Sequence, residues 1–409
     1  MTAKLKIQNL TKIFGDAPDA ARSRLLAGES KARIFEATGS TVGVNNVSFE
    51  VPEGQIFVVM GLSGSGKSTL VRMLNGLIRP TEGSILVDGT DIASCSPAAL
   101  RSMRRNKIAM VFQHFALFPH MSVIDNVAYG LKVKGIGAAH RRRRAQATLD
   151  QVGLGAYADS APDELSGGMQ QRVGLARGLA TDPEVLLMDE PFGALDPLIR
   201  RDVQEELLRL QKTLRKTIVF ITHDLNEALL LGDRIAIMKD GELVQVGTAQ
   251  EIVDHPADDY VSAFVADIDR GKVFTAQSVA QEPVFLQLGT DTAETAVQNM
   301  EDVHRNALYV MDGDNIAGTV TYQDAAAAVR EDGVTLADKV NADYSCVDAS
   351  TPLHELYARA SMGLPIAVTD DNNRLLGVVE PEAVLAQLSG DTPVDADAET
   401  MPSPKDTHV

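Results

Sequence analysis

The sequence contains no tryptophan and only two cysteines among its 409 residues, and its histidines show no H-E-x-x-H or other ligand spacing. We expect Cys95 and Cys346 to lie in different domains. A disulfide framework or a zinc site is therefore not expected, and a reducing cytoplasm fits. No apolar run approaches the ~20 residues that a membrane-spanning helix needs. The first six residues contain lysines but are followed by no long apolar core, so we expect no secretory signal.

Basic residues are scarce in the last third of the chain. Residues 275–409 contain 23 acidic and 6 basic residues, whereas residues 1–274 contain 33 and 32. Almost all of the net charge of −18 therefore lies in the last third. This asymmetry argues against nucleic-acid binding, which needs a basic face. The run from Arg141 to Arg144 could contact nucleic acid or anionic lipid, but a solvated helix face is the favoured interpretation.

A glycine-rich stretch at residues 61–69 has the G-x-x-x-x-G-K-S pattern of a phosphate-binding loop. The apolar run at 56–60 predicts a buried strand before it, and the spacing of the apolar residues at 70–74 predicts a helix after it. In this setting, backbone N–H groups and the helix start can bind phosphates, the lysine can reach the β- and γ-phosphates, and the serine after it can ligate Mg²⁺. The predicted ATP-binding residues are Gly61, Ser63, Gly64, Ser65, Gly66, Lys67, Ser68 and Thr69.

A second predicted strand, residues 184–188, is apolar after Glu184 and is followed by Asp189 and Glu190. Both carboxylates should therefore emerge at the carboxyl end of a parallel sheet, where open α/β sheets bind ligands. Asp189 suits a Mg²⁺ ligand, together with Ser68. Glu190 suits a general base or an orienting group for an attacking water. A nucleoside-triphosphate hydrolase is the chemistry that this combination predicts.

Strand and helix patterns alternate through the first two-thirds of the chain, which predicts a mainly parallel sheet covered on both faces. Residues 16–41 interrupt this pattern as an insert with helical character, and residues 122–154 are largely helical. The predicted first domain spans residues 1–270, with a helical subdomain at about 114–180.

The last third of the chain contains an internal repeat of strand, helix, two strands and helix. Gly318 and Gly377 stand at corresponding points of the two copies. We expect two small α+β domains at residues 275–333 and 334–390, followed by an acidic, disordered tail at 391–409.

The first domain resembles the ATP-binding cassette (ABC) family. The resemblance covers roughly residues 1–265 and rests on the phosphate loop, Gln113, the Leu165-to-Gln171 signature, Asp189-Glu190, the Ala194-to-Asp196 loop and His223, in the family's order. It implies two copies packed head to tail, with each ATP held between the phosphate loop of one copy and the signature of the other. The residues to which the resemblance gives roles are Ser166, Gly167 and Gly168 at the γ-phosphate, Asp196 at the dimer interface, Gln113 near Mg²⁺ and the attacking water, His223 at the γ-phosphate, and Phe14 against adenine. For Phe14, a purely structural aromatic is the alternative.

The insert, the segment from Ile108 to His120 and the repeat narrow the resemblance to the ATPase subunit of glycine betaine/proline betaine importers, which carry paired CBS domains. It then implies an ABC-type α/β domain followed by a tandem CBS pair, at the cytoplasmic face of the bacterial inner membrane as a peripheral subunit. Its partners would be a permease and, indirectly, an external substrate-binding protein. The G-x-x-T-x-x-D pattern that holds a ribose in CBS domains is present in the first copy as Gly318, Thr321 and Asp324 and incomplete in the second. An adenine nucleotide at the pair and a packing module without a ligand both stay open.

Three alternatives remain from the sequence. The cargo could be choline, carnitine or proline, because no residue of this subunit contacts it. The acidic repeat could be a nucleotide or ionic-strength sensor that dominates the C-terminal part and controls the ATPase. A non-transport role is disfavoured, because such relatives tend to carry two fused cassettes or long coiled coils, and this chain has one cassette and no sustained heptads.

Overall fold

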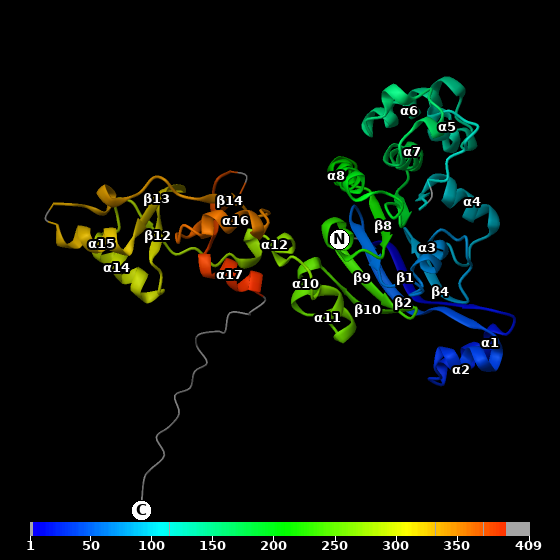
Figure 1. Ribbon diagram of the computed structural model, residues 1–409, viewed down its shortest axis with the longest axis horizontal. Helices are drawn as coiled ribbons and strands as arrows, with labels where there is room; N and C mark the ends of the chain where they lie inside the picture. The colour runs from blue at the N-terminus through cyan, green and yellow to red at the C-terminus, as the bar shows by residue number, and fades with distance from the viewer. Residues whose placement is uncertain (1–2, 114, 332, 371, 390–409) are drawn as a thin grey trace, which may run out of the picture. The chain divides into compact units, whose positions relative to one another are not determined.

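The chain forms two units, each with its own core (Figure 1). The computed structural model describes residues 3–113, 115–331, 333–370 and 372–389, so the tail expected at 391–409 lies outside the described residues. Residue contacts separate the first unit from the second between Asp267 and Ile268.

Two sheets make up the centre of the first unit. The six-stranded sheet has the order β10-β9-β3-β8-β7-β6, and all its neighbouring pairs are parallel except β10 with β9. The four-stranded sheet has the order β2-β1-β4-β5 and is antiparallel. The strands are β1 (Ala3–Phe14), β2 (Thr41–Pro52), β3 (Ile56–Met60), β4 (Glu82–Val87), β5 (Thr90–Asp91), β6 (Ile108–Val111), β7 (Val185–Asp189), β8 (Thr217–Thr222), β9 (Arg234–Lys239) and β10 (Glu242–Gly247).

The expected mainly parallel sheet is confirmed, and its central strands are covered on both faces. All residues of β3, β7 and β8 are buried, as their continuous apolar runs predict. The antiparallel sheet shares this core, since Phe49 of β2 stacks on Phe57 of β3 with ring centroids 4.7 Å apart. The carboxyl ends of β3, β7 and β8 are therefore held side by side, and the residues that follow them meet at one edge.

Helices α5, α6 and α7 pack on one another and gather away from the sheets, at the top of Figure 1. These three helices contact one another, and α7 also contacts β6. The helices of the first unit are α1 (Pro18–Leu26), α2 (Lys31–Thr38), α3 (Lys67–Leu74), α4 (Pro97–Asn106), α5 (Val123–Val133), α6 (Ala138–Gln151), α7 (Gly167–Ala180), α8 (Pro197–Leu214), α9 (Leu225–Leu231), α10 (Ala249–Asp254) and α11 (Asp259–Val265), with 3₁₀ turns at Gly155–Tyr157 and Pro162–Glu164.

The insert forms α1 and α2 and leaves the flanking strands in register. Thr41, the last residue of the predicted insert, is the first residue of β2 and pairs with Phe14 at the end of β1. The two helices have a small core of their own, in which Ala21 and Ile34 pack against Ile13 and Val42. The insert is therefore an excursion at one end of the hairpin, and it does not displace Phe14.

The second unit repeats one α+β motif. In each copy a three-stranded sheet has a parallel first pair and an antiparallel second pair. Gly318 pairs with Val310 and Gly377 with Val368, at the same register position of the two sheets. These small sheets are consistent with a CBS pair. The elements are α12 (Arg270–Val273), α13 (Ala276–Val279), β11 (Phe285–Gln287), α14 (Ala293–Asp302), β12 (Ala307–Asp312), β13 (Asn315–Thr321), α15 (Tyr322–Arg330), a 3₁₀ turn (Leu336–Lys339), β14 (Cys346–Asp348), α16 (Leu353–Ala360), β15 (Ile366–Thr369), β16 (Leu375–Val379) and α17 (Pro381–Ser389).

The two copies meet through their sheets. The fully buried Tyr309 of β12 donates its hydroxyl to the carbonyls of Ser345 and Pro365, at 2.9 and 2.8 Å. Ile316 of the first copy packs with Ala367 and Val378 of the second. A shared apolar core therefore joins the repeat into one body.

Candidate nucleotide site

The glycine-rich loop connects β3 to α3 and lies against backbone of two other segments. Gly61 has a φ of +150°, and a Cβ there would stand 2.2 Å from the carbonyl oxygen of Met238. Gly66 has a φ of +99°, and its Cβ would stand 2.5 Å from the carbonyl oxygen of Gly43. Both positions therefore need glycine, for space and for backbone conformation. The turn after β9 braces the loop as well, since the N–H of Gly241 donates to the carbonyl of Ser65 at 3.0 Å.

Lys67 lies over this loop. Its Nζ donates to the carbonyls of Gly61 and Leu62, at 2.8 and 3.0 Å, and the residue is 4% exposed. Burial lowers the pKa of the Lys67 ammonium, while the nearby carboxylates of Glu190 and Asp189 act to raise it. A phosphate bound in the loop would offer this cation stronger, charge-assisted hydrogen bonds than two carbonyls do.

Ser68 and Asp189 meet at the start of α3 and the end of β7. The Ser68 hydroxyl donates to Oδ1 of Asp189 at 3.2 Å, and Arg72 lies 3.9 Å from Oδ2. Burial raises the pKa of the Asp189 carboxyl, and the hydrogen bond from Ser68 opposes that shift. A buried carboxylate beside a hydroxyl is an all-oxygen donor pair, which fits Mg²⁺.

Glu190, His223 and Gln113 gather beside this pair. Oε2 of Glu190 lies 3.0 Å from Nδ1 of His223, which follows β8. Gln113 comes shortly after β6. Both Gln113 and Glu190 approach Gly193: the point where a Cβ on Gly193 would be lies 3.5 Å from Nε2 of Gln113 and 3.8 Å from Oε2 of Glu190. Glu190 itself has a φ of +45°, rare for a residue with a side chain. Such backbone strain concentrates at functional sites, where the surrounding fold enforces it.

Phe14 lies next to the start of the phosphate-loop helix. Its ring reaches within 2.8 Å of the point where a Cβ on Gly43 would stand, and the methyl group of Thr69 lies 3.6 Å from the same point. Phe14 is 38% exposed, and the ammonium of Lys12 stands 5.1 Å from the centroid of its ring. An exposed aromatic face therefore flanks the phosphate loop.

The signature residues open α7 and lie against the start of α8. Ser166 caps α7 by accepting a hydrogen bond from the N–H of Met169, and Asp196 caps α8 in the same way. Gly167 and Gly168 pack next to Leu195 and Ile199. Among the described residues, these contacts join the signature to the Asp196 loop and not to the phosphate loop of the same chain.

The three candidate residues of the first repeat copy lie at the end of β13 and the start of α15. Thr321 caps α15, accepting from the N–H of Asp324 at 3.2 Å and donating to its Oδ2 at 2.6 Å. Gly318 faces backbone, with its missing Cβ 2.3 Å from the carbonyl oxygen of Asn341. Helix capping and close packing thus account for the pattern without a ligand.

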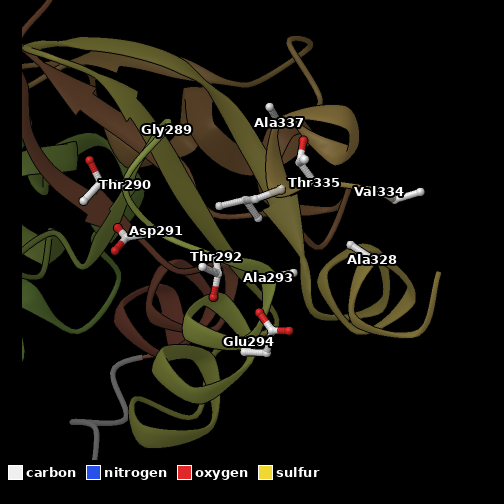
Figure 2. A pocket seen from close by; sticks show the side chains of 11 residues that line it. Gly289, Thr290, Asp291, Thr292, Ala293, Glu294, Ala328, Val334, Thr335 and Ala337 are labelled. Carbon is white, nitrogen blue, oxygen red and sulfur yellow. The ribbon is translucent and has the colours of Figure 1, made fainter. Parts of the chain in front are cut away.

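A cavity of about 460 Å³ lies elsewhere in the same copy, at the starts of α14 and the 3₁₀ turn (Figure 2). Its lining includes Asp291, Thr292, Glu294 and Thr335, and none of Gly318, Thr321 and Asp324 lines it.

Sequence reasoning missed several residues that shape the site. Gly43, Met238 and Gly241 contact the phosphate loop through their backbones, and Arg72 approaches Asp189. The one sequence pattern near any of these residues is the Asp240-Gly241 turn. It predicts a hairpin but does not predict that the hairpin contacts the phosphate loop.

Comparison with known proteins defines the class of the first unit. A family described as ABC transporter matches residues 44–193. The dimeric structure of MJ0796, a bacterial ABC transporter cassette, is 35% identical and superimposes with a TM-score of 0.50, covering 60% of this chain and 98% of that one. A structure of the same cassette bound to ADP and Pi matches equally well. The chain is an ATP-binding ABC transporter ATPase subunit.

Relatives along almost the whole chain define the family further. The glycine betaine transport ATP-binding protein OpuAA of Bacillus subtilis is 47% identical over 390 residues, 95% of this chain and 93% of that protein. The glycine betaine/proline betaine transport system ATP-binding protein ProV of Escherichia coli is 48% identical over 393 residues, 95% of this chain and 98% of that protein. The chain belongs to the family of glycine betaine/proline betaine transport ATP-binding proteins, as the sequence resemblance predicted.

Proposed function

We propose that this subunit hydrolyses Mg²⁺-ATP to power the import of a glycine betaine or proline betaine type of osmoprotectant. The observation that carries the proposal is the 46–48% identity to such transport proteins, which extends over 95% of the chain and so includes the second unit. The cluster of Glu190, His223 and Gln113 beside the phosphate loop supports the hydrolytic part.

Each residue of the site has a task in this proposal. Lys67 and the N–H groups of the loop bind the β- and γ-phosphates, and Ser68 and Asp189 hold Mg²⁺ with Gln113 beside them. The bound metal would supply charge neutralisation on the phosphates. Glu190 takes the proton of the attacking water, and His223, fixed by its contact with Glu190, contacts the γ-phosphate.

We further propose a head-to-tail dimer of this chain. The signature and the phosphate loop of one chain are not joined by described contacts, so a second copy would complete each site. Ser166, Gly167 and Gly168 would then present the start of α7 to the partner's γ-phosphate. Asp196, at the exposed start of α8, would cross the interface.

The permease would dock at the junction of β6 with the helical subdomain. A groove of about 260 Å³ is lined there by Arg104, Phe112 and Arg177, among others, and Phe112 is 37% exposed. Gln113 follows Phe112 directly, and its Nε2 and the Oε2 of Glu190 both lie within 4 Å of the Cβ position of Gly193. No helix among the described residues is long and apolar enough to span a bilayer. We propose a peripheral place on the cytoplasmic face of the bacterial inner membrane, with an external substrate-binding protein acting through the permease.

The second unit would regulate the ATPase. Its charge supports this role, because residues 275–409 carry 23 acidic and 6 basic residues. The interactions of such a surface weaken as the Debye length falls from ~10 Å at 0.1 M salt to ~3 Å at 1 M. Removing residues 268–409 should therefore abolish the salt dependence of transport; unchanged dependence in the truncated protein would refute the regulatory role. A second proposal for this unit is an adenine nucleotide at Gly318, Thr321 and Asp324, which nucleotide titration of the full chain tests.

Replacing Phe14 with alanine should weaken ATP binding about 5- to 150-fold, because stacking on a base contributes about 1–3 kcal/mol and 1.4 kcal/mol is tenfold in affinity. Phe35→Ala is the matched control, since Phe35 is an exposed aromatic on the insert. Titration calorimetry of the full chain with ATP measures both. Equal affinities for the wild type and Phe14→Ala would show that Phe14 has only a structural role.

Uptake identifies the cargo. Cells that depend on this ATPase, its permease and its binding protein should accumulate labelled glycine betaine, and unlabelled proline betaine should compete. Competition by choline, carnitine or proline alone would assign the alternative cargo instead.

A further inference from the structure

A buried polar cluster lies next to the Glu190–His223 pair, between α8 and the start of α9. Its centre is the Glu227 carboxylate on α9, which is 6% exposed. Thr222 at the end of β8 and Gln204 on α8 surround it and are 2% and 6% exposed. Such groups are costly to bury and are kept only where their partners are in place.

The contacts of Glu227 fix the chain on both sides of His223. Oε2 of Glu227 accepts a hydrogen bond from the Thr222 hydroxyl at 2.5 Å, and Oε1 accepts one from Gln204 at 3.0 Å. The Thr222 hydroxyl in turn accepts from the N–H of Asp224 at 3.0 Å. The residues before and after His223 are thus both tied to this carboxylate, while the imidazole points to Glu190.

Arg200 connects this cluster to the loop that carries Asp196. Its Nη2 donates to the carbonyl of Leu195 at 3.1 Å, and its Nη1 donates to Oδ2 of Asp224 at 3.4 Å. Its Nε lies 3.8 Å from Oε1 of Glu227 and makes no hydrogen bond to any described residue. The ion pair between Arg200 and Glu227 is therefore long. Because Arg200 also donates to the Leu195 carbonyl, a small shift of that carbonyl would change the distance between the guanidinium and Glu227.

The electrostatics make this pair sensitive to the loss of either partner. Burial raises the pKa of the Glu227 carboxyl; the hydrogen bond from Thr222 and the charge of Arg200 oppose that shift, and the charge of Asp224 adds to it. Removing one partner of a buried pair leaves the other without compensation.

We propose that Glu227 and Arg200 are positioning residues for ATP hydrolysis. Glu227 holds His223 against Glu190, and Arg200 carries a displacement of the Leu195–Asp196 loop to His223. The dimer interface at Asp196 and the hydrolytic centre are then connected within one chain. The proposal rests on the roles proposed above for His223 and Asp196.

The first test is the effect of Glu227→Gln on hydrolysis by the full chain assembled with its permease. We expect kcat to fall about tenfold while KM for ATP stays within about twofold, because a misplaced group costs rate and the phosphate loop is untouched. Glu205→Gln is the matched control: Glu205 is a carboxylate of α8 in an exposed pair with Arg201. Wild-type kcat in Glu227→Gln, or an equal loss in Glu205→Gln, would overturn the proposal.

A double-variant cycle separates positioning from general stabilisation. If Glu227 acts through His223, Glu227→Gln should lower kcat further by less than about twofold in a His223→Ala background. A merely structural role would give the same tenfold loss in both backgrounds and would refute the proposal. Arg200→Lys keeps the charge but loses the two guanidinium N–H groups that donate to Leu195 and Asp224. It should likewise lower kcat by less than about twofold in the His223→Ala background, and it replaces Glu227→Gln in the test if that variant does not fold. Full activity of His223→Ala alone would instead remove the role of His223 and leave the ATPase assignment standing.

Discussion

Replacing Glu190 with glutamine should lower the rate of ATP hydrolysis about 100-fold or more and leave ATP binding intact. Glutamine keeps the size of the side chain but cannot take the proton of the attacking water, and a positioned general base contributes about 10²–10⁴-fold. Because the phosphate loop and Lys67 are unaffected, the ATP-bound dimer should accumulate. Phosphate release measures the rate, and size-exclusion chromatography with ATP measures the dimer.

Glu184→Gln is the matched control for this prediction. Glu184 is a carboxylate just before the opposite end of β7, where it pairs with Lys4 and Lys107. Its replacement can alter stability, but it should leave kcat unchanged. Full hydrolysis by Glu190→Gln would remove Glu190 from the mechanism and leave the base to be sought elsewhere.

Replacing Lys67 with alanine should weaken ATP binding by about 10- to 150-fold, because hydrogen bonds to charged groups are worth about 1.5–3 kcal/mol and 1.4 kcal/mol is tenfold in affinity. The two carbonyls that now accept from Lys67 belong to the glycine-rich loop, so the alanine variant removes a cation held at that loop. Titration calorimetry with ATP gives the affinity, and thermal unfolding checks that the variant is folded.

The control here is Lys6→Ala, which removes a half-exposed lysine of β1 that pairs with Glu50. It should bind ATP like the wild type. If Lys67→Ala bound ATP as tightly as Lys6→Ala does, the glycine-rich loop would not be the phosphate site.

Local patterns predicted the elements that carry the site, because the site follows the ends of buried strands. The apolar runs before Gly61 and Asp189 have the length and composition of parallel strands, and the structure brings their ends to one sheet edge. The repeat was also predictable, since each copy has the same order of elements and a glycine at the same register position.

Tertiary contacts could not be predicted in this way. That Gln113 lies near Glu190, or that Gly61 faces the carbonyl of Met238, depends on strands far apart in the sequence. The insert is an example, because 26 residues at 16–41 follow Phe14 closely in the sequence, and local patterns do not say where the strand after them pairs. The pairing of Phe14 with Thr41 leaves the ring next to the phosphate loop.

Buried polar groups were the hardest to foresee. Arg200 and Glu227 occupy helical positions whose spacing is equally typical of solvated helix faces, and only the fold brings them together. Conversely, the Thr321-to-Asp324 pattern suggested a ribose site, and the structure also accounts for it as a helix cap. A short polar motif at a helix start has two explanations, and the surrounding contacts are needed to weigh them.

The most direct test of the account is the ATPase activity of the complete complex, with its permease and binding protein, measured with and without glycine betaine at rising salt. We predict that glycine betaine stimulates hydrolysis and that salt increases this stimulation. Stimulation by glycine betaine that does not depend on salt would support the import function and refute the regulation by ionic strength. Hydrolysis that does not respond to glycine betaine at any salt concentration would contradict the account, and the chain would then be an ABC ATPase for another cargo.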